Sequence, residues 1–171
     1  MKKIMVLVLL ILLTGCTPRL SNLQIELIPQ VDTIEVNSDF EDLGAKATYG
    51  PVDLDFSIIY DDLDITKVGV YERVYEATYG DLSKTAKRVI HVVDQSPPVI
   101  TLNAGMDTIY LGETWIDASV TATDNSMLPV TIETTGVVLQ AVGTYYITYK
   151  AVDAYLNDAI VTRIVTVIEQ P

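Results

Sequence analysis

One sequence unit occurs twice in this chain, and the repeat limits the folds that the chain can adopt. Residues 69–77 and 143–151 each start with Gly and then place Tyr, a variable residue, Tyr and Ala at alternate positions. A period of two is typical of a strand with one buried face. Three further pairs of segments match at one constant offset: 25–27 and 100–102, 32–36 and 107–111, and 88–92 and 163–167. This constant spacing predicts one domain duplicated in tandem.

The composition and the turn signals predict an all-β fold for both copies. Val, Ile, Thr and Tyr are frequent after the first sixteen residues, which favours sheet, and no convincing amphipathic helix is present. A Tyr two residues after a Gly that opens a strand is also typical of a tyrosine corner, whose hydroxyl bonds back to a nearby loop. We expect a small seven-strand sandwich in each copy. The expected strands are 24–28, 33–36, 44–49, 54–60, 62–66, 69–79 and 84–93, then 99–102, 107–111, 118–123, 130–134, 136–140, 143–152 and 158–168.

The N-terminus has the pattern of a bacterial lipoprotein signal. Two lysines precede ten apolar residues at 4–13, which as a helix would span about 15 Å, half of a bilayer core. Residues 13–16, Leu-Thr-Gly-Cys, resemble the lipobox, which implies cleavage before Cys16 and attachment of diacylglycerol to its thiol. We therefore expect a signal peptide at 1–15 and a lipidated Cys with a polar spacer at 16–22. The alternative is an ordinary secretory signal, but Cys16 is the only Cys and so has no disulfide partner within the chain.

The chain is strongly acidic, and this excludes some partners. Its formal charge is −12, which becomes −14 when Lys2 and Lys3 leave with the signal peptide. Nucleic-acid phosphates and anionic headgroups repel such a surface. We therefore expect no nucleic-acid partner, and we expect the lipid on Cys16 to be the anchor on the extracytoplasmic face of a bacterial membrane.

The second copy carries motifs that resemble a known domain family. In order, they are PPVITL at 97–102, LGETW at 111–115, ATD at 122–124, GTY at 143–145, AVD at 151–153 and RIVTV at 163–167. This pattern looks like the bacterial immunoglobulin-like (Ig-like) domain that occurs in tandem on surface and secreted proteins. The resemblance implies two Ig-like β-sandwiches, used as adhesion or spacer modules without catalytic residues. The implied domains are 23–94 and 98–170, with a linker at 95–98.

The first copy departs from this pattern at Arg73. This residue occupies the position of Ile147, where an inward apolar side chain is expected. We expect either that Arg73 extends out to solvent at a sheet edge or that the register of the first copy slips locally.

No catalytic constellation is visible. His91 is the only His and aligns with Thr166 on a strand face that should point to solvent. Zinc sites, Cys–His pairs and a Ser-His-Asp triad all need more than one isolated imidazole. The chain also lacks a Gly-x-Ser-x-Gly turn and a Gly-rich phosphate loop. We therefore predict that the protein is not an enzyme.

We also predict no cofactor, with calcium as the alternative that the sequence leaves open. Asp94 precedes the linker, Asp124 follows a predicted strand, and Asp153 and Asn157 share a loop of the second copy. Calcium binds six to eight oxygen ligands, which acidic loops can supply. However, the Asp-x-Asp-x-Asp-Gly spacing of a dedicated calcium loop is absent, and Asp and Asn also form simple turns. A second acidic group, which is expected to be a solvated face, consists of Asp53, Asp55, Asp61, Asp62 and Asp64.

The aromatic residues divide into core and surface candidates. Trp115 aligns with Phe40, so a shared packing role is expected, with carbohydrate stacking as the alternative. Three tyrosines that should point outward are candidates for contact with a ligand: Tyr110, Tyr146 and Tyr155.

These features favour a noncatalytic, lipid-anchored surface protein that binds a protein or a glycan through strand edges and loops. The alternative is a structural spacer or envelope-stabilising module without a soluble ligand. A substrate-binding lipoprotein of a transporter would need a larger α/β chain, which this length and strand pattern argue against.

Overall fold

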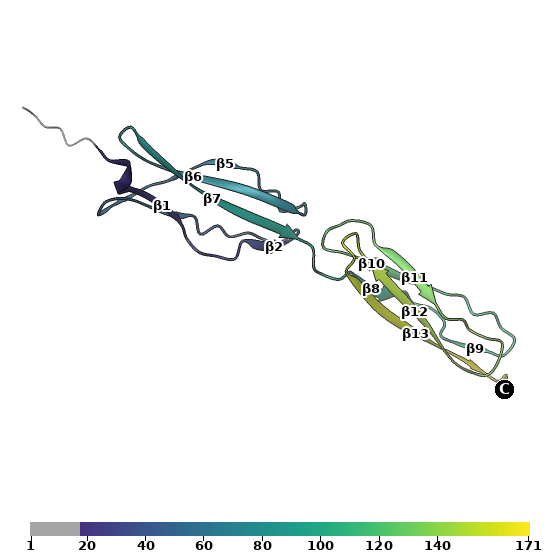
Figure 1. Cartoon of the computed structure of the whole chain (residues 1–171). Coiled ribbons are helices and arrows are strands. Elements are labelled where there is room, and N and C mark those ends of the chain that lie inside the picture. Colours follow the sequence, from purple (N-terminus) through teal and green to yellow (C-terminus); the bar gives the residue numbers. More distant parts are fainter. Residues whose placement is uncertain (1–17) are drawn as a thin grey trace, which may run out of the picture. The chain divides into compact units, whose positions relative to one another are not determined.

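The computed structural model of the protein describes residues 18–171, so the predicted signal peptide and Cys16 lie outside its range and stay predictions. Over these residues the fold is all-β, as predicted, and the only helical segment is a 3-10 turn at Leu20–Asn22 (Figure 1). The strands of the first copy are β1 (Leu23–Leu27), β2 (Thr33–Glu35), β3 (Ala45–Tyr49), β4 (Val52–Leu54), β5 (Ser57–Asp61), β6 (Gly69–Tyr79) and β7 (Leu82–Val93). Those of the second copy are β8 (Val99–Leu102), β9 (Thr108–Tyr110), β10 (Val120–Thr123), β11 (Thr131–Thr135), β12 (Gly143–Val152) and β13 (Asp158–Ile168).

Strand pairing follows the same plan in both copies. In the first copy, β1, β3 and β4 form one sheet, and β2, β7, β6 and β5 form the other in that order. In the second copy, β8 pairs with β10, and β9, β13, β12 and β11 form the four-stranded sheet. β2 runs parallel to β7, and β9 runs parallel to β13 in the same way. The internal repeat of the sequence is therefore also a repeat of topology.

The chain folds into two compact units, and the limits of these units differ from the limits of the two sequence copies. The first unit contains the described residues up to Pro29 together with Leu43–Tyr60 and Val74–Lys87. The second unit contains Gln30–Asp42, Asp61–Arg73 and Arg88–Pro171. The boundary thus runs through strands β6 and β7, and the domain limits expected from the sequence stay predictions.

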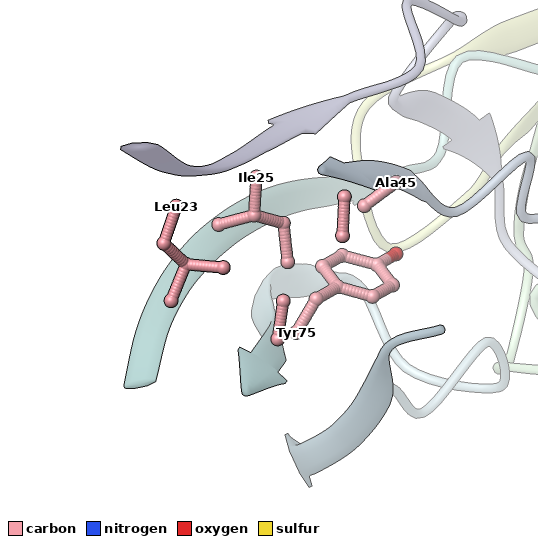
Figure 2. Packing of buried hydrophobic residues seen from close by; sticks show 6 residues of the cluster. Leu23, Ile25, Ala45 and Tyr75 are labelled. Atoms are coloured by element: carbon pink, nitrogen blue, oxygen red, sulfur yellow. The ribbon is translucent and has the colours of Figure 1, made fainter. Parts of the chain in front are cut away.

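Each copy has its own apolar core around one buried tyrosine. In the first copy, Tyr75 is fully buried, and Figure 2 shows Ile25 and Ala45 next to its ring. In the second copy, Tyr149 is equally buried and packs with Ile147 and Val165. Both tyrosines occupy the inward positions that the alternating pattern predicts.

The expected tyrosine corner is present in both copies. The hydroxyl of Tyr71 donates to the carbonyl of Lys67 at 2.8 Å. The hydroxyl of Tyr145 donates to the carbonyl of Ala141 at 2.7 Å. In each case the bond holds the chain four residues before the tyrosine against the strand that follows.

An ion pair between a buried Arg and a partly exposed Asp is a second feature that the two copies share. The side chain of Arg88 is almost fully buried, and its Nη1 lies 2.8 Å from Oδ1 of Asp32. Arg163 is buried to the same degree, and its Nη1 lies 2.8 Å from Oδ1 of Asp107. These pairs hold β2 and β9 next to the long strands β7 and β13.

Three strand predictions were wrong. Residues 62–66 form no strand because Asp61 and Asp64 accept bonds from backbone N–H groups two residues on, which closes local turns. Residues 136–140 form none either, since Gly136 has a φ of 104° and leads the chain out of the sheet. The single strand expected at 54–60 is instead two strands, β4 (Val52–Leu54) and β5 (Ser57–Asp61).

The expectation that Arg73 extends out to solvent was also wrong, while a local slip of the register stays a prediction. Its side chain is only 14% exposed, and its guanidinium binds Asp42 at 2.8 Å and Asp61 at 2.6 Å. It also lies over the ring of Phe40, at 5.7 Å from the ring centroid. The inward position is thus occupied by a charge because two carboxylates neutralise it there.

Candidate functional site

Three aspartates from separate loops converge in the second compact unit. Asp94 directly follows β7, Asp124 directly follows β10 and Asp153 directly follows β12. One carboxylate oxygen of each lies within 4.8 Å of the others. At this distance two unit charges repel by about 3 kcal/mol at an effective dielectric constant of about 20. Three ionised carboxylates therefore destabilise each other unless a positive charge compensates them.

Asp153 is held in place by its own loop. Its Oδ1 accepts from the backbone N–H groups of Tyr155 and Asn157, both at 2.8 Å. Its Oδ2 accepts from Nδ2 of Asn157 at 2.8 Å, and the same nitrogen donates to the carbonyl of Asp94 at 3.3 Å. Asn157, a candidate ligand from the sequence, therefore presents its donor to the site and orients Asp153.

Asp124 is fixed on one side only. Its Oδ2 accepts from the backbone N–H of Ser126 at 2.8 Å and from the Ser126 hydroxyl. Its Oδ1 is buried without a hydrogen-bond partner. Oδ2 of Asp124 thus bonds within the turn, and Oδ1 is available to bind a ligand.

Asp94 has no hydrogen-bond donor at either carboxylate oxygen, although the residue is only 8% exposed. The nearby hydroxyl of Ser126 gives its proton to Asp124. Burial raises the pKa of Asp94, and the negative charge of Asp124 raises this pKa further. A carboxyl group with this environment is an anomaly in a folded chain.

Glu35 and Asn125 border the aspartates. Oε1 of Glu35 accepts from the backbone N–H groups of Gln95 and Ser96, both at 2.8 Å, and from Nδ2 of Asn125 at 3.3 Å. Burial acts to raise the pKa of Glu35, but these hydrogen bonds outweigh it and lower the pKa overall. The Oδ1 of Asn125 is buried without a partner, like Oδ1 of Asp124.

The first copy has tyrosines at the two positions that correspond to Asp124 and Asp153. Asp124 corresponds to Tyr49 at the constant offset of the repeat, and Asp153 corresponds to Tyr79, since each lies two positions after the Ala that ends the Gly-Tyr unit. The two tyrosine rings stack with centroids 3.8 Å apart and an interplanar angle of 6°. The same two positions are therefore neighbours in both copies, but only the second copy has aspartates there.

The three candidate tyrosines are all exposed but do not form one group. Tyr146 in β12 is 61% exposed and pairs with Ile164 of β13, while Tyr110 in β9 pairs with Ile168 of β13. Paired residues share a sheet face, so these four side chains lie on one outer face. Tyr155 instead follows β12 and borders a hollow lined also by Ser126 and Leu128.

His91 and Trp115 have the environments expected of them. His91 is exposed on β7. Trp115 is half-buried against the core of the second copy, and its Nε1 donates to the carbonyl of Met106 at 2.9 Å. Its role in packing agrees with the alignment to Phe40.

Comparison with known families agrees with the sandwich topology. The family model described as "Bacterial surface protein, Ig-like domain" matches residues 100–167. The predicted resemblance is confirmed. The match covers the Ig-like segment of the second copy, including Asp124 and Asp153. No curated protein matches the chain in sequence.

Among solved structures, the chain is similar to two protocadherin fragments. The crystal structure of human protocadherin-24 EC1-2 has a TM-score of 0.42 and 12% identity, over 86% of this chain and 98% of that one. The protocadherin gammaB7 EC3-6 cis-dimer structure has a TM-score of 0.42 and 16% identity, over 88% of this chain and 41% of that one.

Within residues 18–171, no helix has the length and apolarity needed to cross a membrane.

Proposed function

We propose that this chain is a noncatalytic, lipid-anchored surface protein that binds a protein or glycan on the outside of a bacterial cell. The match of residues 100–167 to a surface Ig-like family supports the location. The lipobox-like residues before Cys16 support the anchor. The lone exposed His91 offers no partner for acid–base or nucleophilic catalysis, which supports a binding role.

The observation that carries a binding role is the exposed apolar face of β9, β12 and β13. Tyr146 and Ile164 are paired in the sheet and are 61% and 54% exposed, and Ile160 of the same strand is 61% exposed. Tyr110 and Ile168 continue this face toward β9. Aromatic and aliphatic side chains that stand together on an outer face are typical anchors of a binding interface.

Adhesion of cells that display the full-length protein tests this function. Replacing Tyr146→Ser and Ile164→Ser together should reduce binding to glycan arrays or to neighbouring cells by at least about tenfold. Val70→Ser is the matched control, because Val70 is 62% exposed but lies in β6 of the first copy. Unchanged adhesion of the double variant would favour the spacer function instead. In the same cells, Cys16→Ala should release the protein from the membrane fraction.

A further inference from the structure

We propose that Asp94, Asp124 and Asp153 form a binding site for one calcium ion. The three ligands come from the ends of β7, β10 and β12, all within the second compact unit. This inference goes beyond the surface function proposed above and does not depend on it.

The first reason is the set of buried oxygens without donors. Both oxygens of Asp94 and Oδ1 of Asp124 lack a hydrogen-bond partner. The neighbouring donors are already committed, because Ser126 bonds to Asp124 and Asn157 bonds to Asp153. Among the described residues, no Lys or Arg forms an ion pair with any of the three aspartates. Buried carboxylates that lack both donors and basic partners require a cation or a proton.

The second reason is the spacing of the ligand atoms. Calcium binds oxygens at 2.3–2.6 Å, so two ligands on opposite sides of the ion lie about 4.6–5.2 Å apart. The three carboxylate oxygens lie within 4.8 Å of one another and can therefore bind the same calcium ion. Magnesium demands a nearly ideal octahedral geometry and keeps several of its waters. Calcium is the ion that tolerates a wider and less regular set of carboxylates.

The oxygens with free lone pairs provide the ligands and the negative charge that a calcium ion needs. Asp94 has both oxygens free and can bind in a bidentate manner, and Asp124 contributes Oδ1. Oδ2 of Asp153 accepts one bond, from Asn157, and keeps a lone pair for the metal. The unpartnered Oδ1 of Asn125 is the next candidate, and water completes the shell. Three carboxylates against one divalent cation leave a small net charge.

The third reason is the contrast between the two copies. In the first copy, the stacked rings of Tyr49 and Tyr79 occupy the positions of Asp124 and Asp153, and they stabilise each other without a ligand. Stacked rings offer no ligand set for a hard cation. The stoichiometry is therefore one calcium per chain and not one per copy.

The experiment is a thermal melt of the full-length protein in detergent, after chelation and then with added calcium. At a concentration about a hundred times the Kd, calcium should raise the melting temperature by about 5–10 °C. Titration calorimetry should give one ion per chain. Asp94→Asn should abolish this rise and also melt higher than the wild type in chelator, because it removes one of three repelling charges. Asp53→Asn removes one charge from an exposed strand and should keep the full calcium response.

Several outcomes would overturn the site. A melting temperature that calcium leaves unchanged would show that a proton neutralises Asp94 instead. An equal rise in the wild type, Asp94→Asn and Asp53→Asn would mean nonspecific binding to an acidic chain. A response to magnesium at the same concentration without one to calcium would assign the site to the smaller ion, and two ions per chain would contradict the contrast between the copies.

Discussion

At Asp94, a carboxyl group is buried beside two other carboxylates and meets no donor. Its pKa in the folded chain is raised above the ordinary value of 3.8, first by burial and then by the charge of Asp124. A raised carboxyl pKa means that the folded chain binds the proton more tightly than the unfolded chain does. Stability is therefore lost as the pH rises from the unfolded pKa through the folded one.

This sign gives a prediction for the protein in chelator. Between pH 4 and pH 7, the wild type should lose stability relative to Asp94→Asn, and the difference should stay constant once Asp94 is fully ionised. Glu35 acts in the opposite direction, since its lowered pKa gives stability that is lost as the pH falls, but both proteins share this contribution. The measurement is the free energy of unfolding in urea at each pH. A difference that does not vary with pH would show that Asp94 ionises freely.

The buried arginines show what the sequence could reveal at the scale of single residues. Arg88 and Asp32 recur as Arg163 and Asp107 at the constant offset of the repeat, so their recurrence was visible in the alignment of the two copies. Their burial was not visible, because an Arg in an alternating strand usually points to solvent. Arg73 was misread for the same reason. Only the folded chain brings Asp42 and Asp61 next to it.

Among the elements, the segment between β11 and β12 depends on one glycine. Gly136 has a φ of 104°, and a Cβ at this position would lie 2.3 Å from the carbonyl oxygen of Tyr146. Gly112 has a φ of 94° but would place its Cβ in open space. A comparison of substitutions at these two glycines therefore separates the cost of a positive φ from the cost of steric overlap.

Substitution of these glycines should have unequal effects on stability. Gly112→Ala should cost about 1–2 kcal/mol, because an L-residue is strained at positive φ. Gly136→Ala should cost about 1–3 kcal/mol more, since β12 must shift to admit the methyl group. Chemical denaturation of both variants measures this difference. Equal costs would show that the chain at Gly136 moves away from β12 without loss.

Most strands were predictable to within one or two residues, but two predicted segments form no strand. β6, β8, β12 and β13 were predicted with their observed limits, because alternation with a period of two continues over their whole length. The segments 62–66 and 136–140 are rich in residues that favour strands, but local Asp turns and a positive φ at Gly136 exclude them from the sheets. Whether such a segment forms a strand or a turn depends on side-chain hydrogen bonds, which the periodicity of the sequence does not reveal.

For the whole molecule, the duplication predicted from the sequence recurs in the strand topology, and the copies differ at two positions of the candidate site. The sequence nominated Asp94, Asp124 and Asp153 from their loop positions, and the structure brings one oxygen of each within 4.8 Å of the others. Their burial and their lack of donors could not be predicted, because both result from the packing of three separate loops. Asn157 was also predicted as a candidate ligand, and its Nδ2 donates to Oδ2 of Asp153.

The two copies also allow the site to be exchanged within one molecule. Asp124→Tyr and Asp153→Tyr together should install the stacked pair that Tyr49 and Tyr79 form in the first copy. The double variant should melt at least as high as the wild type in chelator, because a ring contact of about 0.5–1.5 kcal/mol replaces repulsion between carboxylates. It should show no response to calcium. Each single variant leaves one Tyr without a stacking partner and should be less stable than the double variant. If the double variant is instead the least stable of the three, the two ends of the sandwiches are not equivalent, and the carboxylates contribute more to folding than a cation site requires.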